Sequence, residues 1–221
     1  MFVPERLRTI ASFIEPNEKV ADVGADHGIL ELLLITRDTN NKVVAIENKR
    51  GPYNILKDNI GAIKNIRLSL SDGITAVDKD VDTVVLAGMG GINIVNILQQ
   101  YPKKVERINK IIVDAHTDGR KVREYLTQNG FEIKKEKIVS ESKYFYIICV
   151  FENTGKKVIY NEDELEFGYK LYQDPLWDTY KDFLIGKLQR KLNAIEGKKN
   201  LDKKGKHIES LIERLSNYGK N

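Results

Sequence analysis

Two carboxylates, one histidine and two glycines lie within seven residues, Asp22-Val23-Gly24-Ala25-Asp26-His27-Gly28. An apolar run precedes this stretch and another follows it, which predicts a buried strand that turns directly into a helix. Such a turn brings backbone N–H groups and a helix N-terminus to the edge of a parallel sheet. Gly24 and Gly28 lack Cβ atoms, so a flat ligand could approach the backbone there.

The charge in this turn favours one kind of ligand. The stretch lacks the middle glycine of the dinucleotide-binding pattern, and Asp26 stands near that place. A carboxylate would repel a pyrophosphate and favour a ligand with positive charge. S-adenosylmethionine (SAM) is such a ligand, because it has a sulfonium and an ammonium group and no phosphate. The alternative is an ordinary strand-turn-helix without a ligand.

Two further carboxylates follow predicted strands. Glu47 ends the run Val43-Val44-Ala45-Ile46 and lies 23 positions after Gly24. That distance predicts the end of the second strand of a βαβ unit, where the acid could accept hydrogen bonds from ribose hydroxyls. Asp72 and Gly73 follow a third strand, and Asp72 could accept a bond from an adenine amino group. The alternatives are a surface glutamate at the first position and an Asp-Gly turn at the second.

A second glycine-rich turn follows the run Val81–Ala87. Its residues are Gly88-Met89-Gly90-Gly91, and the helix 92–100 is predicted to begin after them. We expect Ala87, Gly88 and Met89 to contact the cofactor, and Gly90 and Gly91 to admit a substrate base. A tight turn with a packing methionine is the alternative interpretation.

The elements that would position these residues form a regular series. A short amphipathic helix over 4–14 comes first, and its Arg6 and Arg8 are interpreted as solvated charges, with phosphate contacts as the alternative. Alternating strands and helices follow up to the strand 110–113, which leads into Asp114-Ala115-His116. Two strands over 131–140 and 144–152 then form a hairpin. This order predicts an α/β fold with the Rossmann-like seven-stranded sheet of SAM methyltransferases.

Composition excludes several classes of protein. The chain has 221 residues, of which 41% are hydrophobic, so a sizeable core is expected. One cysteine and three scattered histidines argue against a cysteine-rich zinc site or a disulfide framework, and Cys149 is expected to be a buried structural thiol. We expect no metal. Because the sequence lacks a signal peptide pattern and a membrane-spanning run, we expect a cytoplasmic monomer without a membrane partner.

The composition changes after Asn153, which predicts two domains with ranges 1–153 and 154–221. A helical pattern runs from Glu162 to about Ile195, either continuous or broken near Asp174-Pro175, and a second pattern follows after Asn200. Leu184, Leu188, Lys191 and Leu215 recur at three- and four-residue steps in these patterns and indicate an antiparallel coiled coil. Residues 186–221 contain 10 Lys or Arg and 4 Asp or Glu, a net charge of +6. A solvated helix face is the ordinary explanation, but this asymmetry favours an RNA-binding arm. The candidate RNA contacts are Arg190, Lys191, Lys198 and Lys199.

Together, these residues resemble the TrmK-type bacterial tRNA adenine-N1 methyltransferases, which modify adenine 22. The likeness lies in Asp22–Gly28, in Ala87-Gly88-Met89-Gly90-Gly91 and in the order of the two domains. It implies SAM as cofactor, tRNA as substrate and 1-methyladenosine as product. The family tends to carry a Gln-Pro-Asn-like segment after the fifth strand. In this sequence the corresponding residues are Asp114-Ala115-His116, so the resemblance does not imply a base contact from the segment after the fifth strand.

The reaction itself suggests two catalytic residues. The N1 lone pair of neutral adenine is already available, so the enzyme mainly has to flip the base out and align it. A carboxylate near the base would stabilise the positive charge that develops on it, and Asp26 is the candidate. His27 is the candidate for a base-edge or phosphate contact. Alternatively, Asp26 only orients the SAM amino group and His27 only caps the following helix. At the level of function, the alternatives are methylation of another substrate and a non-catalytic RNA-binding or SAM-sensing module.

Overall fold

The computed structural model describes residues 3–195 and 201–220. It divides into two compact units, Met1–Ile159 and Tyr160–Asn221, which are described separately below. Within the described residues, no helix is both long enough and apolar enough to cross a membrane.

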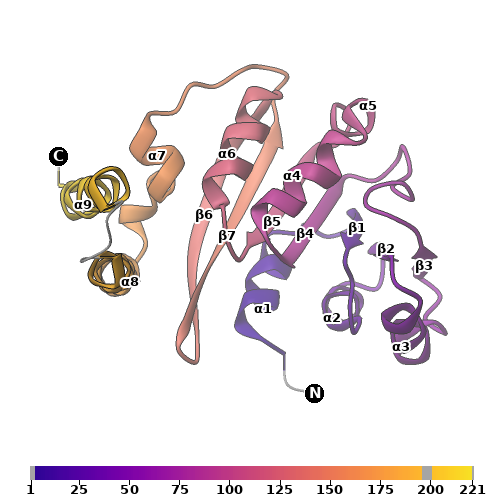
Figure 1. Ribbon diagram of the computed structural model, residues 1–221. Coiled ribbons are helices and arrows are strands. Elements are labelled where there is room, and N and C mark those ends of the chain that lie inside the picture. Colours follow the sequence, from indigo (N-terminus) through magenta and orange to yellow (C-terminus); the bar gives the residue numbers. More distant parts are fainter. Residues whose placement is uncertain (1–2, 196–200, 221) are drawn as a thin grey trace. The chain divides into compact units, whose positions relative to one another are not determined.

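A seven-stranded mixed sheet forms the centre of the first unit (Figure 1). Its strand order is β3-β2-β1-β4-β5-β7-β6, and only the pairings of β7 with β5 and with β6 are antiparallel. This is the predicted fold class, which is therefore confirmed. The strands are β1 (Lys19–Val23), β2 (Lys42–Glu47), β3 (Ile66–Leu70), β4 (Thr83–Met89), β5 (Lys110–Ala115), β6 (Phe131–Glu141) and β7 (Tyr144–Asn153).

Helices cover both faces of this sheet. Figure 1 shows α1, α2 and α3 on one face and α4, α5 and α6 on the other. The apolar side chains of the central parallel strands are buried between these layers, as the continuous β-branched runs predicted. The short helix α5 was not predicted from the sequence. The bounds are α1 (Glu5–Ser12), α2 (Ile29–Arg37), α3 (Arg50–Ile60), α4 (Gly91–Gln99), α5 (Pro102–Val105) and α6 (Gly119–Gln128).

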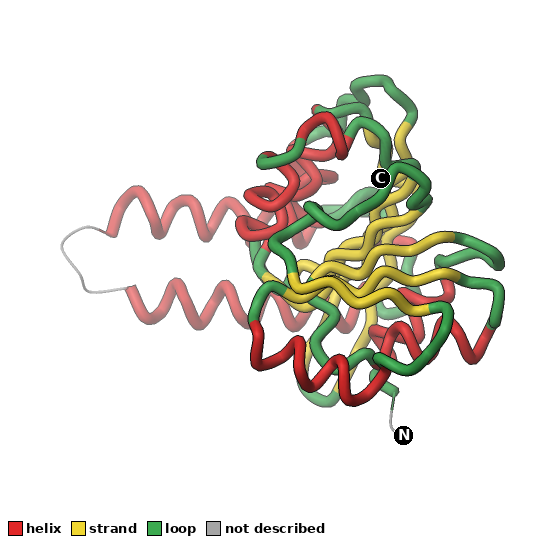
Figure 2. Tube along the Cα trace, turned by 90° about the vertical axis from the view of Figure 1, so that its right-hand side faces the viewer, coloured by secondary structure: helices red, strands yellow, loops and turns green. Residues whose placement is uncertain are grey.

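The second unit is helical. Two long helices, α8 (Trp177–Ile195) and α9 (Leu201–Asn217), pack against each other as a hairpin (Figure 2). A shorter helix, α7 (Glu162–Phe167), and a 3-10 turn, η1 (Leu171–Gln173), precede them. Tyr218 joins these pieces, because its ring packs edge-on against Tyr172 and Trp177 and its hydroxyl donates to the Gly168 carbonyl oxygen at 2.6 Å.

Two details of the helical prediction are corrected. The pattern that begins at Glu162 is broken, and the first break lies earlier than Asp174-Pro175, because α7 ends before Gly168, whose φ of +112° is incompatible with an α-helix. The predicted apolar seam included Lys191, but this side chain is exposed and its neighbour Leu192 is buried in its place. The packing therefore follows the apolar side chain, and Lys191 faces solvent.

Candidate functional site

A cleft of about 500 Å³ opens at the carboxyl ends of β1, β2 and β4. Ligands bind at this edge in doubly wound sheets, because the strand order reverses there. Eight of the predicted site residues line the cleft: Asp22, Gly24, Asp26, His27, Glu47, Ala87, Gly88 and Met89. The other predicted positions of this unit, Gly28, Asp72, Gly73, Gly90 and Gly91, are not among its lining residues, and their assignment to ligands stays a prediction.

The first glycine turn has the backbone that its sequence predicts. Gly24 has a φ of +86° and Gly28 a φ of +78°, and both conformations are rare for residues with a Cβ. The N–H group of Gly24 donates to the Ile46 carbonyl oxygen at 2.8 Å, which ties the turn to β2. A Cβ on Gly28 would lie 2.8 Å from Ile60 Cδ1, so the absence of a side chain at Gly28 also lets α2 pack against α3.

Glu47 has a fixed orientation at the end of β2. The residue is 8% exposed, and its Oε1 accepts hydrogen bonds from the backbone N–H groups of Asn48 and Lys49 at 3.0 and 2.9 Å. These two bonds hold the carboxylate at the cleft wall, where it could accept further bonds from a ligand. Asp72 is exposed and accepts a bond from Asn48 Nδ2 at 3.4 Å, so it is linked to the cleft through a lining residue.

Asp22 and Glu31 form a buried acidic pair behind the turn. Asp22 is 6% exposed and lines the cleft, whereas Glu31 on α2 is fully buried. Burial raises the pKa of Asp22 to about 7, although the neighbouring Glu31 and the charge of Arg6 oppose the change. Burial and the charge of Asp22 also raise the pKa of Glu31 well above its ordinary value. A cationic ligand would favour the ionised form of Asp22.

The two candidate catalytic residues lie at the mouth of the cleft. The side chains of Asp26 and His27 are 71% and 55% exposed, and His27 Nε2 lies 3.6 Å from Asp26 Oδ1. Gly28 is the N-cap residue of α2, and His27 comes directly before it. Both side chains are accessible to a large substrate.

The second glycine turn meets the first. A Cβ on Gly24 would lie 3.2 Å from Met89 Cε, so the missing side chain lets the two turns come together. At Gly91, a Cβ would lie only 2.4 Å from the backbone oxygen of Asp118. Gly91 therefore lets the start of α4 pack against the loop before α6.

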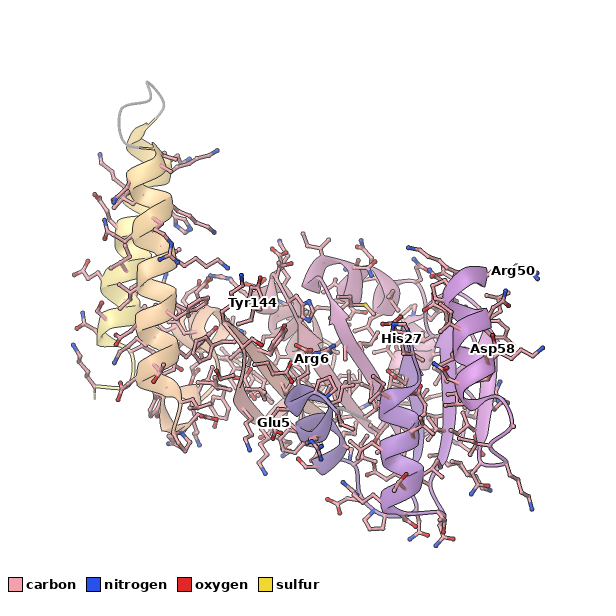
Figure 3. All side chains as sticks on the ribbon, turned by 90° about the horizontal axis from the view of Figure 1, so that it is seen from below. Glu5, Arg6, His27, Arg50, Asp58 and Tyr144 are labelled. Atoms are coloured by element: carbon pink, nitrogen blue, oxygen red, sulfur yellow. The ribbon has the colours of Figure 1, made fainter. Side chains whose placement is uncertain are left out.

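Sequence reasoning missed a cluster on one wall of the cleft. Arg6 was interpreted as a solvated charge, but its side chain is only 26% exposed, and its Nη1 lies 3.5 Å from Oδ2 of the fully buried Asp114. Its backbone N–H donates to Glu141, and its guanidinium lies near the same carboxylate. Arg6 and His116 both line the cleft. Figure 3 shows Arg6 on α1 and His27 beside α2, two helices that pack together. No local sequence pattern could have joined these distant residues.

The cleft is suited to a cationic ligand. It is lined by three carboxyl groups and by the two cations Arg6 and Lys49. Among the described residues, no group of three His, Cys, Asp or Glu side chains could hold a metal ion. Cys149 is buried outside the cleft lining, and burial raises the pKa of its thiol well above the ordinary value, so it is not an activated nucleophile.

The second unit carries the predicted basic contacts. Arg190 and Lys191 are exposed on α8. Lys187 is also exposed, and its spacing from them places all three on one face of the helix. Lys198 and Lys199 lie outside the described residues.

Comparison with known proteins extends these findings. A family model described as a methyltransferase domain matches residues 3–149. The tRNA (adenine(22)-N(1))-methyltransferase of Bacillus subtilis (strain 168) is 25% identical over 217 residues, which are 96% of this chain and 85% of that protein. MG248 of Mycoplasma genitalium, a candidate tRNA methyltransferase, is 30% identical over 175 residues, which are 76% of this chain and 78% of the relative.

The whole chain also resembles a solved structure. Sp1610 of Streptococcus pneumoniae, a candidate tRNA (m1A22) methyltransferase, superposes with a TM-score of 0.88 at 27% identity, over 97% of this chain and 98% of that chain. Its complex with S-adenosyl-L-methionine superposes with a TM-score of 0.80 at 25% identity, again over 97% and 98% of the two chains. The chain belongs to the methyltransferase domain family whose model it matches.

Proposed function

We propose that this protein is a SAM-dependent tRNA methyltransferase that methylates N1 of adenine 22 and so forms 1-methyladenosine. The observation that carries the proposal is the cleft at the strand ends, where Glu47 is fixed by two backbone N–H groups next to the two glycine turns. The likeness to the Bacillus subtilis enzyme, which covers 96% of this chain, supplies the substrate.

The cleft residues suit the cofactor. Glu47 would accept hydrogen bonds from the ribose hydroxyls, and Gly24 would let the ligand lie close to the backbone. The acidic lining favours a ligand with sulfonium and ammonium charges over one with phosphates. When bound, SAM supplies an electrophilic methyl group. Asp72 and Gly73, at the end of the third strand, would lie toward the adenine end of the cofactor.

Asp26 would act on the acceptor base. Its carboxylate lies at the open mouth of the cleft, where the ring of a flipped adenine gains positive charge as N1 is methylated. Asp26→Asn should lower the single-turnover rate while the SAM affinity stays nearly intact. Calorimetry and quench-flow measurements separate the two effects. If only SAM affinity falls, Asp26 is a cofactor ligand and not a catalytic residue.

The C-terminal range 154–221 would bind the tRNA. Its +6 charge over residues 186–221 includes the exposed face of Lys187, Arg190 and Lys191 on α8, and Lys198 and Lys199 are further candidate contacts in the sequence. Contacts from such side chains would be to phosphates, so they would provide affinity and register and would not read bases. We expect the protein to act as a monomer in the cytoplasm.

The decisive experiment is incubation of the full-length protein with labelled SAM and unmodified tRNA, followed by nuclease digestion and mass spectrometry. We expect 1-methyladenosine at position 22, and no product from a transcript with guanine there. Label on another class of molecule would indicate a methyltransferase with a different substrate. Binding of SAM without transfer to any acceptor would indicate a sensing module.

A further inference from the structure

The buried carboxylate of Asp114, near the end of β5, lacks a hydrogen-bond partner among the described residues. Asp114 has no exposed side-chain surface, and neither of its carboxylate oxygens accepts a hydrogen bond within the described structure. The two nearest donors, Arg6 Nη1 and His116 Nε2, each lie 3.5 Å from Oδ2. Because a buried carboxylate without hydrogen bonds is costly, its retention beside a ligand cleft calls for an explanation.

His116 connects this carboxylate to the cleft. Its side chain is 39% exposed and lines the cleft, and its backbone N–H donates to the Met89 carbonyl oxygen at 3.0 Å. The second glycine turn and the imidazole therefore share one wall. The nitrogen nearer to Asp114 is Nε2, so a proton on Nε2 faces the carboxylate and Nδ1 is left as a hydrogen-bond acceptor.

An aromatic ring and a cation pack next to His116. The rings of His116 and Tyr146 have centroids 5.2 Å apart and are inclined by 58°. The Arg6 guanidinium carbon lies 5.8 Å from the centroid of Tyr146 and offsets the charge of Asp114. The backbone N–H of Arg6 donates a hydrogen bond to Oε1 of Glu141 at 2.6 Å. The imidazole of His116, which lines the cleft, thus offers an acceptor nitrogen and a flat ring next to which a base could lie.

We propose that Asp114 orients His116 so that Nδ1 of His116 accepts a hydrogen bond from the exocyclic amino group of the flipped adenine. The inference rests on the proposed function and names the residue that recognises the acceptor base. His116 is the recognition residue and Asp114 is its positioning residue. The contact distance of 3.5 Å between them shortens when the base binds, as hydrogen bonds in ligand-free active sites commonly do.

The chemistry of the base explains why this contact would matter. The amino group of adenine is a donor, whereas guanine has an oxygen acceptor at the same place, so an acceptor on the protein selects adenine. Methylation at N1 puts a positive charge on the ring, and the adjacent amino group shares it. Its N–H bonds then become stronger donors, so the bond to His116 is stronger in the transition state than in the ground state. Asp114 stabilises the polarised imidazole.

The test compares two acceptors in a full-length tRNA, one with adenine at position 22 and one with purine, which lacks the amino group. Single-turnover rates with saturating SAM and tRNA give an adenine-to-purine rate ratio for each protein. We expect His116→Ala to lower this ratio roughly tenfold, as loss of one hydrogen bond implies. Its SAM affinity, measured by calorimetry, should remain within about twofold. Comparing ratios removes the intrinsic difference in N1 reactivity between the bases.

Two further variants separate positioning from general damage. Asp114→Asn keeps the size of the buried side chain and should also lower the ratio, because an amide can donate to His116 and reverse its tautomer. Thr117→Ala changes the exposed residue next to His116 and should leave the ratio at the wild-type value. If Asp114→Asn does not fold, His116→Ala still tests the inference. The His116 side chain is partly exposed, so its removal should not prevent folding.

The outcomes are distinct. If the wild-type protein methylates adenine 22 and His116→Ala retains the full adenine-to-purine ratio, the inference is overturned and the proposed function stands. If the wild-type protein methylates no tRNA, the proposed function fails and the inference fails with it. An equal loss of rate on both acceptors would also contradict the inference, because it would show a role for His116 that does not involve the amino group.

Discussion

Asp22 gives a quantitative test of the electrostatics behind the first turn. Its carboxyl group is 6% exposed, and burial raises its pKa from the ordinary 3.8 to about 7. The folded chain therefore holds a proton on Asp22 at pH values where the unfolded chain has lost it. When the folded state binds more protons, the free energy of unfolding falls as pH rises. For Asp22 this fall runs from about pH 4 to about pH 7, and the full penalty is present above that window.

The size of the penalty follows from the two pKa values. Each pKa unit corresponds to about 1.4 kcal/mol, so the ionised carboxyl destabilises the ligand-free fold by about 4 kcal/mol at pH 8. About 3 kcal/mol of this amount develops between pH 5 and pH 8. Asp22→Asn keeps the shape and removes the charge. The substitution also removes the charge of Asp22, which helps to raise the pKa of Glu31. This second effect likewise favours the variant over the wild type as the pH rises.

The assay is urea unfolding of the ligand-free wild-type and Asp22→Asn proteins at pH 5 and pH 8. The difference in unfolding free energy should move by about 3 kcal/mol in favour of the variant between the two pH values. A constant offset from the new amide cancels in this comparison. Asp58→Asn, an exposed position on α3 (Figure 3), is the matched control and should shift by less than about 0.5 kcal/mol. A difference between wild type and Asp22→Asn that stays constant from pH 5 to pH 8 would refute the burial argument.

Three further predictions follow from the cleft and from α8. Glu47→Ala should weaken SAM binding by about 2–3 kcal/mol in calorimetry, because charge-assisted bonds to the ribose are lost, and unchanged affinity in a folded variant would contradict the assignment. Gly91→Ala should destabilise the protein by about 1–3 kcal/mol in thermal unfolding, since the new Cβ would lie 2.4 Å from a backbone oxygen; unaltered stability would show that the loop yields freely. Replacing Lys187, Arg190 and Lys191 together by Ala should weaken tRNA binding and reduce the slope of log affinity against log salt by about 2–3, as mobility shifts at several salt concentrations can show. The same slope in both proteins would place the RNA contacts elsewhere.

The sequence predicted the sheet and the cleft because their signals are local. Buried strands read as continuous apolar runs, and each candidate residue follows directly on such a run. The carboxyl ends of neighbouring parallel strands lie at one edge, so Gly24, Glu47 and Met89 meet without any further information. The packing roles of Gly28 and Gly91 could not be predicted, because they depend on which helix or loop lies opposite each glycine.

The wall made by Arg6 and Asp114 is a different case. An arginine on a short amphipathic helix and an aspartate at the end of a strand have no sequence pattern in common. Only the packing of α1 against α2 and against the β6–β7 hairpin brings the guanidinium next to β5. A solvated arginine is the usual outcome for such a residue, so the sequence alone gave no reason to expect a buried ion pair.

Two of the carboxylates at the cleft, Asp22 and Asp114, are poorly solvated in the ligand-free protein. Asp22 meets this difficulty by taking up a proton near neutral pH, whereas Asp114 has Arg6 within 3.5 Å to balance its charge. A cationic cofactor next to Asp22 would supply positive charge that the folded chain lacks there, and a polarised imidazole would supply Asp114 with a hydrogen-bond donor. The energy lost by burying these groups in the free protein is then recovered on binding and in the transition state. On the proposed function, this recovery would explain two buried carboxylates in a core that would be more stable without them.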